Sequence, residues 1–190
     1  MITLRDLKIK DAPLMLEWMK DNEISSVFAK DMSKNTIDDV EGFCRESFLL
    51  NDRVRSSKSS DSIVNGISLH FAIVDDSDDE YRGTISLKNI DIRNNSAEYA
   101  ISTRKKFHGT DTAKSATVLI LKKAFKEYRL HRVYLNVMEK NERAIHFYKK
   151  CGFIFEGRFR DSIIKDGIYE NLEWYSILFD EFEVKWGHSL

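Results

Sequence analysis

The chain of 190 residues is long enough to bury one hydrophobic core and too short for two, so we expect a single domain over residues 1–190. Its 30 basic and 31 acidic side chains give a formal net charge of −1, which excludes a whole-chain field that attracts nucleic acid or membranes. Cys44 and Cys151 are the only cysteines, and the 5 histidines include no pair at metal-ligand spacing, so neither a disulfide scaffold nor a metal site is predicted. The N-terminal segment MITLRDLKIKDAPLM carries charges every few residues and predicts neither a signal peptide nor a membrane span, so we expect a cytoplasmic protein.

The first third of the chain predicts one strand and two helices. Ile2–Arg5 alternates as a short strand does, and Asp11–Lys20 begins with a good N-cap and a proline, which favours a helix. Apolar residues recur at helical spacing over Asn35–Leu50, where either of the first two residues can cap the first turn. Arg53–Asn65 is rich in Ser and Asp and predicts an exposed surface loop, a composition that also suits a loop beside a binding site.

Beyond residue 66 the pattern predicts strands and one long helix. Ile67–Val74 and Gly83–Ile92 predict an antiparallel hairpin, and Ala97–Ser102 predicts a third strand of the same meander. Thr112–Tyr128 has a broad apolar face and predicts a buried helix. Arg132–Met138 is apolar on both faces and predicts a central strand. Two further strands are predicted at Phe153–Gly157 and Asn171–Phe179.

The segment Glu139–Phe153, EKNERAIHFYKKCGF, contains more than an amphipathic helix requires. Asn141 stands where a strand gives way to a helix, so its side chain can cap the helix and still offer an amide to a ligand at the strand end. Tyr148 follows seven residues later, about two turns along the same side of the helix. Gly152 is expected to end the helix in a left-handed conformation. The alternative for Tyr148 is a core aromatic ring whose hydroxyl reaches the surface.

The element order and these local motifs resemble the acyl-CoA-dependent N-acetyltransferase superfamily called GNAT, over nearly the whole chain. Within it the sequence is most similar to the branch of ribosomal-protein N-terminal, spermidine and nucleotide-aminosugar acetyltransferases. The resemblance implies an α/β fold with a mixed central β-sheet, an antiparallel meander and helices on both faces. The segments that carry it are Asn141–Tyr148, Gly152–Phe153, Glu156–Gly157 and Asp166–Tyr169.

The resemblance also implies acetyl-CoA as co-substrate and assigns residue roles. Asn141 is expected to help hold the pantetheine arm, and Tyr148 to act as the general acid that protonates the departing CoA thiolate. Backbone N–H groups of the third meander strand are expected to contact pantetheine and polarise the thioester carbonyl. The residues concerned are Ile101, Ser102 and Thr103.

Attack by an amine also needs a base, because an alkylammonium is mostly protonated near neutrality. Glu98 is the candidate, acting directly or through water. It lies in the third meander strand, out of phase with Tyr99 and Ile101, and matches an acidic residue that relatives place beside the acceptor amine. The alternative is an ordinary exposed strand carboxylate.

The loop expected to bind the CoA pyrophosphate departs from the family pattern. Gly109 and Ala113 keep small residues, but Asp111 occupies a position where glycine is usual. A carboxylate there repels a pyrophosphate unless it turns away to cap the following helix. The predicted cofactor-binding residues of the loop are Lys106, His108, Gly109, Thr110, Asp111, Thr112 and Ala113. Five basic residues near the loop are expected to offset the Asp111 charge by contacting the phosphates: Arg104, Lys105, Lys106, His108 and Lys114. The alternative is that they form a solvated basic face.

We therefore expect an enzyme that transfers an acetyl group from acetyl-CoA to a primary amine by direct attack in a ternary complex, without a metal. The alternative is a non-catalytic GNAT-fold binding or regulatory protein whose degenerate loop has lost CoA. We expect a monomer or homodimer with no nucleic-acid or membrane partner, and a polyamine, an aminosugar or a protein N-terminus stays open as acceptor. Carboxylates that could bind a polyamine occur at Asp38, Asp39, Glu41 and Glu46. The alternative is that these residues form a solvated acidic face of the helix. Side chains for a nucleotide sugar occur at Phe28, Phe48, Arg53 and Arg55.

Overall fold

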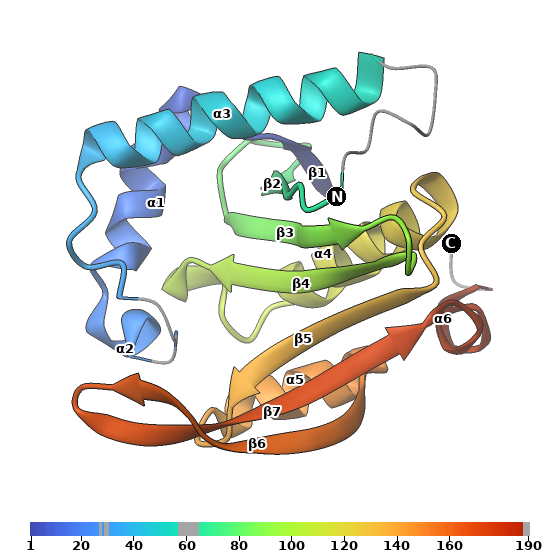
Figure 1. The fold of residues 1–190 in the computed structure, drawn as a ribbon. Coiled ribbons are helices and arrows are strands. Elements are labelled where there is room, and N and C mark those ends of the chain that lie inside the picture. The colour runs from blue at the N-terminus through green and yellow to red at the C-terminus, as the bar shows by residue number, and fades with distance from the viewer. Residues whose placement is uncertain (27, 29–30, 57–64, 188–190) are drawn as a thin grey trace.

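A computed structural model describes residues 1–26, 28, 31–56 and 65–187 of the chain. Its centre is a seven-stranded mixed sheet in the order β1-β2-β3-β4-β5-β7-β6 (Figure 1). Every neighbouring pair is antiparallel except β4 and β5, which are parallel. The strands are β1 (Ile2–Asp6), β2 (Leu69–Asp75), β3 (Gly83–Asp91), β4 (Ser96–Thr103), β5 (Arg132–Met138), β6 (Ile154–Lys165) and β7 (Ile168–Leu178).

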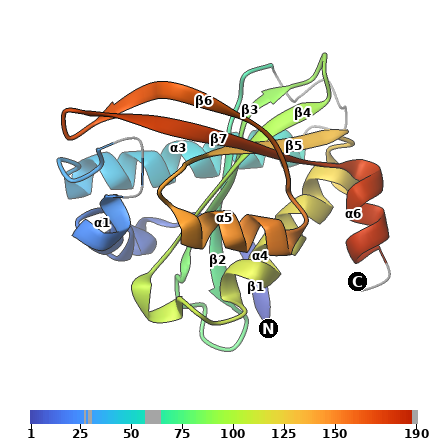
Figure 2. The same cartoon turned by 90° about the horizontal axis from the view of Figure 1, so that it is seen from below.

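Helices cover both faces of this sheet, because apolar side chains alternate in direction along its strands. On β2, Phe71 and Ile73 join the core under α4 and α5, whereas Ala72 and Val74 join the core under α1. Figure 2 shows α5 beside α4 on one face, with α6 at the end of β7. The α-helices are α1 (Ala12–Met19), α2 (Asn22–Ser25), α3 (Ile37–Ser56), α4 (Thr112–Lys122), α5 (Glu142–Cys151) and α6 (Phe179–Trp186). The predicted fold class is confirmed.

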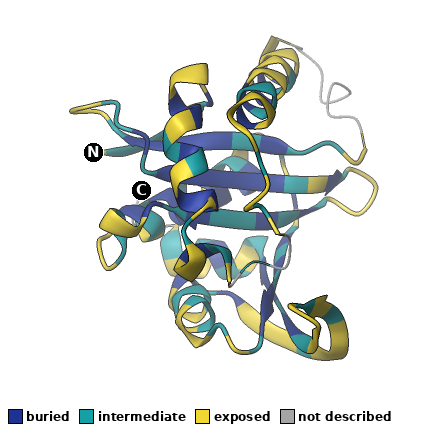
Figure 3. Ribbon diagram, turned by 90° about the vertical axis from the view of Figure 1, so that its left-hand side faces the viewer, coloured by how far each residue is buried: buried dark blue, intermediate teal, exposed yellow. Residues whose placement is uncertain are grey.

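Burial follows this layered arrangement (Figure 3). Most residues of β2 and β3 are buried, while β6 at the edge of the sheet is largely exposed. Among the described residues, no helix combines the length and the apolar character that crossing a membrane requires.

The predicted loop over residues 53–65 is wrong at its start, because α3 continues to Ser56. Val54 is buried against the main core, and the Arg55 guanidinium donates to the carboxylates of Asp6 and Asp52. These tertiary contacts extend the helix through a sequence with weak helical signals. Residues 57–64 of the predicted loop lie outside the described residues.

The C-terminal part also differs from the prediction. The strands expected at 153–157 and 171–179 are the ends of a long hairpin, in which β6 and β7 meet at Asp166 and Gly167. Both turn residues have positive φ, 52° and 80°, as the Asp-Gly pair of a two-residue hairpin turn favours. The helix α6 was not predicted, although Glu181 accepts a hydrogen bond from the Leu178 N–H and so caps its first turn.

The predicted helix caps have mixed outcomes. Gly152 ends α5 with a φ of 102°, as expected. Thr36 and Asp39 form reciprocal hydrogen bonds at the start of α3. Asp11 does not cap α1, because its carboxylate accepts hydrogen bonds from the Arg5 guanidinium and the Lys8 N–H instead.

Candidate active site

The candidate site is a cleft that opens where β4 and β5 separate. Their parallel pairing covers only Ser96–Glu98 against Arg132–Tyr134, while β5 stays paired with β7 up to Met138. The edge of β4 from Tyr99 onward therefore has no strand partner, and its main-chain groups on that side are free to pair with a ligand. The cleft has a volume of about 1350 Å³ and extends from β4 and β5 to α2, α5 and α6.

The three β4 residues expected to contact pantetheine, Ile101, Ser102 and Thr103, all line this cleft. The Ser102 hydroxyl is buried and has no hydrogen-bond partner among the described residues. Such a group is costly to bury unless something in the cleft satisfies it. The free edge of β4 is therefore suited to an extended ligand with several polar groups.

Asn141 and Tyr148 line the same cleft from α5. The Asn141 Oδ1 accepts a hydrogen bond from the Ala144 N–H at 3.2 Å, so the residue caps α5 as expected and its Nδ2 stays available for a ligand. The Tyr148 ring packs edge-to-face with Tyr99, Phe147 and Phe153, at centroid distances of 5.5 to 6.0 Å.

The Tyr148 hydroxyl has no hydrogen bond to a described residue, although the ring is partly buried. Burial raises the pKa of this phenol well above its usual value, and the nearby Cys151 thiol contributes in the same direction. A phenol with a raised pKa stays protonated at neutral pH. Tyr148 therefore presents a proton donor to the cleft.

Glu98 lies on β4 at the last residue that pairs with β5. Its side chain is 16% exposed and accepts hydrogen bonds from Lys88 Nζ at 2.7 Å and Asn89 Nδ2 at 2.9 Å. Since Glu98 and Tyr99 are adjacent on a strand, they point to opposite faces of the sheet. The Glu98 carboxylate thus faces the side of α1 and α2, and Tyr99 faces Tyr148.

The predicted phosphate loop forms one edge of the cleft, but not with every residue expected there. His108, Gly109, Thr110, Asp111 and Ala113 line the cleft, whereas Lys106 and Thr112 do not. Thr112 is buried, where its hydroxyl accepts a hydrogen bond from Thr110.

His108 in this loop has its Nε2 at 3.0 Å from the Thr103 carbonyl. Partial burial lowers the pKa of its imidazole. His108 is therefore mostly neutral near pH 7 and contributes hydrogen bonding rather than charge to the loop.

The helix-capping alternative for Asp111 is wrong, because its side chain makes no capping hydrogen bond to α4. The carboxylate instead lies at the cleft, at the start of a helix whose N–H groups attract anions. Gly109 in the same loop has a φ of 78°, which the absence of a Cβ allows.

Three basic residues expected to compensate for Asp111 are engaged elsewhere. Arg104 is buried and donates to the carboxylates of Glu17 and Glu80, at 3.0 and 2.9 Å. Lys105 pairs with Glu23 on α2 at 2.7 Å, and Lys106 pairs with Glu80. Arg104 and Lys105 therefore join α1 and α2 to the β4–α4 segment, and Lys106 and Arg104 join that segment to the β2–β3 connection.

Several cleft residues were missed by the sequence analysis. Lys88 lies opposite Glu98 on β3, a relation that strand register alone determines. Ile24 forms part of the wall on the α2 side. Lys185 and Trp186 of α6 line the far end. The signal for α6 was the apolar spacing of Phe179, Phe182 and Trp186 after an acidic first turn.

The residues considered for acceptor binding lie mostly elsewhere. The four acidic residues considered for a polyamine do not line the cleft; among them the Asp39 carboxylate accepts a hydrogen bond from the Thr36 N–H at the start of α3, and Glu41 pairs with Arg45. Of the aromatic and basic set, only Phe28 lines the cleft. No group of three potential metal ligands occurs among the described residues.

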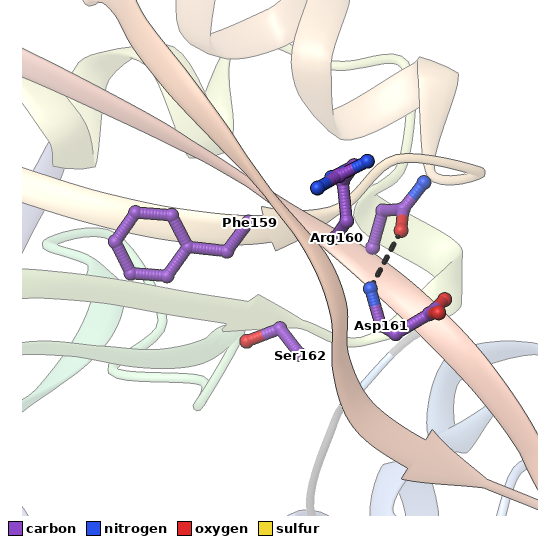
Figure 4. A pocket seen from close by; sticks show the side chains of 5 residues that line it. Phe159, Arg160, Asp161 and Ser162 are labelled. Carbon is purple, nitrogen blue, oxygen red and sulfur yellow. Dashed lines mark hydrogen bonds between the residues drawn. The ribbon is translucent and has the colours of Figure 1, made fainter.

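A second hollow of about 810 Å³ lies at the irregularity of the β6–β7 hairpin (Figure 4). It is lined by Phe159, Arg160, Asp161, Ser162 and Asn171. The Asp161 N–H donates to the Asn171 side chain at 2.9 Å, and the Phe159 ring packs on Trp174. This hollow shares no lining residue with the cleft and gathers no acid–base pair beside a free strand edge.

Comparison with known proteins decides the family. Residues 1–154 match the sequence model of the family described as "Acetyltransferase (GNAT) domain". The chain belongs to this family.

Individual relatives of this GNAT chain agree with that result. It is 29% identical to the spermidine N(1)-acetyltransferase of Vibrio cholerae over 106 residues, which cover 56% of this chain and 61% of that protein. The matches to the first curated relatives thus span about half to three fifths of their length. It is also 29% identical to the probable N-acetyltransferase YjcK of Bacillus subtilis, with 93% of both chains covered.

Solved structures show the same fold. A structure of spermidine N-acetyltransferase from Vibrio cholerae in complex with CoA and spermine superposes with a TM-score of 0.77 at 23% identity. The superposition covers 95% of this chain and 97% of that one. The GNAT fold is therefore shared over nearly the whole chain.

Proposed function

We propose that this GNAT chain transfers an acetyl group from acetyl-CoA to a primary amine, by direct attack in a ternary complex. The observation that carries the proposal is the early end of the β4–β5 pairing at Glu98 and Tyr134. It leaves a free strand edge beside Asn141 and Tyr148, where an extended thioester can pair with main-chain groups.

The two candidate catalytic residues lie on opposite sides of this cleft. Tyr148 packs against Tyr99 on the face of α4 and α5, whereas Glu98 points to the face of α1 and α2. Acetyl-CoA would therefore enter from the α4–α5 side and the amine from the α1–α2 side. This arrangement supports a ternary complex, because the thioester carbonyl then lies between the base and the acid.

The proposed reaction uses both groups in turn. Glu98, directly or through water, removes a proton from the ammonium, and the amine lone pair attacks the thioester carbon. The carbonyl oxygen gains charge that β4 N–H groups around Ile101 to Thr103 would stabilise. When the C–S bond breaks, the nitrogen loses its second proton to solvent, and the sulfur leaves as a thiolate and takes a proton from the Tyr148 hydroxyl. The proton gained by Glu98 returns to solvent, from which Tyr148 regains its own.

Cofactor-binding roles at the loop are proposed for the residues that line the cleft. Asn141 would donate its free Nδ2 to pantetheine, and His108, Gly109, Thr110 and Ala113 would surround the pyrophosphate. Asp111 would lie close to the same phosphates. No role in cofactor binding is proposed for Lys106 or Thr112, since neither reaches the cleft.

The acceptor class we propose is a primary amine of a small molecule or of a protein N-terminus. Two carboxylates on the acceptor side of the cleft are already ion-paired, Glu98 with Lys88 and Glu23 with Lys105.

We propose a cytoplasmic setting, which the two free, buried cysteines support.

Calorimetry with CoA and a screen of acetyl-CoA consumption test the proposal. The screen covers polyamines, aminosugar nucleotides and peptides with free N-termini. We expect CoA to bind and, at a concentration a hundredfold above its Kd, to raise the free energy of unfolding by about 2.7 kcal/mol. We also expect turnover with one acceptor class. Absence of binding at millimolar CoA would overturn the proposal and favour a non-catalytic role.

A further inference from the structure

Four cations that line the cleft form no ion pair with a described acidic residue. One of them, Arg143 at the start of α5, lies near His108 of the predicted phosphate loop, and the other three are lysines of α4, α5 and α6. Lys114 on α4, Lys150 on α5 and Lys185 on α6 line the cleft, and none forms an ion pair with a described acidic residue. By contrast, Arg104 and Lys105 are committed to acidic partners. Apart from Arg143, the free positive charge among the described cleft residues therefore comes from lysines of three separate helices.

Trp186 connects these helices. Lys114 Nζ and Lys185 Nζ lie 5.7 and 5.6 Å from the centre of the Trp186 ring, within the range of cation–π attraction. The indole N–H donates to the Cys151 carbonyl at 3.1 Å, next to Lys150 at the end of α5. The hydrogen bond thus fixes the orientation of the Trp186 indole, which places the ammonium groups of Lys114 and Lys185 near the end of α5.

Gly152 allows α6 to approach α5 this closely. A Cβ at Gly152 would lie 2.7 Å from Lys185 Cδ, so the aliphatic stem of Lys185 crosses the place where any other residue would have a side chain. The stem is packed and the ammonium group reaches the cleft. Lys185 is therefore a positioned cation and not simply a mobile surface lysine.

CoA carries its phosphate charge in two places, the pyrophosphate and the 3′-phosphate of the adenosine. The start of α4 and the loop before it suit the pyrophosphate. The second charged group lies beyond the pyrophosphate along the ligand, and Lys114 in the first turn of α4 leads from the loop to Trp186. The residues of α6 lie beyond residue 154, where the match to the family model ends.

We propose that Lys114 and Lys185, which contact the Trp186 ring, together with Lys150 at the end of α5, bind the adenosine 3′-phosphate of acetyl-CoA. This inference rests on the proposed function. It makes α6 a part of the cofactor site and assigns to the helices the charge that Arg104, Lys105 and Lys106 have lost to ion pairs with Glu17, Glu23 and Glu80.

Calorimetry with CoA and with 3′-dephospho-CoA tests the proposal directly. We expect the wild-type chain to bind CoA at least about tenfold more tightly than dephospho-CoA, since a hydrogen bond to a charged group contributes about that factor. Lys185→Met and Lys150→Met should each weaken CoA binding about tenfold and change dephospho-CoA binding less than twofold. Methionine keeps the packed stem in both variants.

Lys122→Met is the matched control, because Lys122 is an exposed lysine of α4 that does not line the cleft. It should leave the affinity for both ligands unchanged. Equal wild-type affinity for CoA and dephospho-CoA would overturn the inference, as would a loss in the lysine variants that is the same for both ligands. Failure of the wild-type chain to bind either ligand would instead overturn the proposed function.

Discussion

The cofactor side and the acceptor side of the cleft are built in different ways. On the cofactor side, Asn141, Tyr148 and Gly152 belong to one helix and its caps. On the acceptor side, the contacts join distant segments, such as Arg104 and Glu17, which are 87 residues apart. A helix motif can be recognised from its spacing, whereas ion pairs between distant segments depend on the completed fold.

The comparison also concerns the charge of the site. Arg104 and Lys105, which sequence position associates with the phosphates, pair instead with acidic residues of α1 and α2, and Lys106 pairs with Glu80 in the β2–β3 connection. Salt bridges that join two packed elements fix their relative placement more than they add to stability. The cofactor side is left with the cations of α4, α5 and α6.

The largest effect is expected on the acceptor side, from Glu98→Gln. Replacing the proposed base should lower kcat/KM for the amine by at least about 10²-fold, while calorimetric binding of acetyl-CoA stays unchanged. Lys88→Met is the matched variant, because it removes the ion-pair partner of Glu98 and keeps the Glu98 carboxylate. A Glu98→Gln enzyme with wild-type kcat/KM would remove Glu98 from the mechanism.

Tyr148→Phe tests the cofactor side. It removes one oxygen and keeps the ring contacts with Tyr99 and Phe153, so stability should be preserved. Loss of the general acid should lower kcat about 10²-fold, or roughly 2.7 kcal/mol, with little change in KM for acetyl-CoA. The loss is moderate because a thiolate with a conjugate-acid pKa of about 8.5 leaves tolerably well unaided.

Steady-state kinetics with a turnover acceptor measure this effect. Tyr99→Phe serves as the control, since the Tyr99 hydroxyl is bonded to Thr117 within the core and does not face the thioester. Normal kcat in Tyr148→Phe would show that the tyrosine is only a packing residue.

The acceptor-side core is expected to be sensitive to acid through His70. Burial between Phe43 of α3 and Ser86 of β3, with a smaller contribution from Lys88, lowers the pKa of His70 to about 4. Because the unfolded chain takes up this proton near pH 6.5, stability is complete above that pH and falls as the pH approaches 4. Lowering the pH from 7 to 5 should cost about 2 kcal/mol of unfolding free energy through this residue.

Urea denaturation at pH 7 and pH 5 measures this cost in the wild-type chain and in His70→Gln. The variant should lose less stability between the two pH values, whereas His131→Gln, at an exposed position, should behave as the wild type. An unchanged pH difference in His70→Gln would contradict the assignment.

The smallest effect is expected from Asp111→Asn in the cofactor loop. Because the carboxylate does not cap α4, removing its charge should leave the melting temperature within about a degree and tighten CoA binding about threefold to tenfold. Asp111→Gly should tighten binding similarly. A fall in melting temperature with unchanged CoA affinity would show that Asp111 stabilises the start of α4 and does not oppose the phosphates.

Several elements could be predicted because their signals are local. The Asn141-to-Gly152 segment was predicted correctly in its helix, its N-cap and its left-handed end, since all three depend on neighbouring residues. The Asp166-Gly167 turn carries an equally local signal, because an Asp-Gly pair with positive φ favours the two-residue turn of the β6–β7 hairpin. The extension of α3 to Ser56 could not be predicted, because Val54 and Arg55 stabilise it through residues elsewhere in the chain.

Local sequence signals were sufficient to predict the seven strands, the helices α1, α3, α4 and α5, the family motif and the residues that α5 presents on one side, but not α2 or α6. Those features follow from periodicity, capping and turn chemistry within a few residues. Only the tertiary structure decided where β4 leaves β5, which carboxylates hold Arg104 and Lys105, and that Lys185 and Trp186 line the cleft. The physical reason is that a charge pairs with whatever group the fold brings within a few ångströms, and a strand edge is free only where no other strand reaches it.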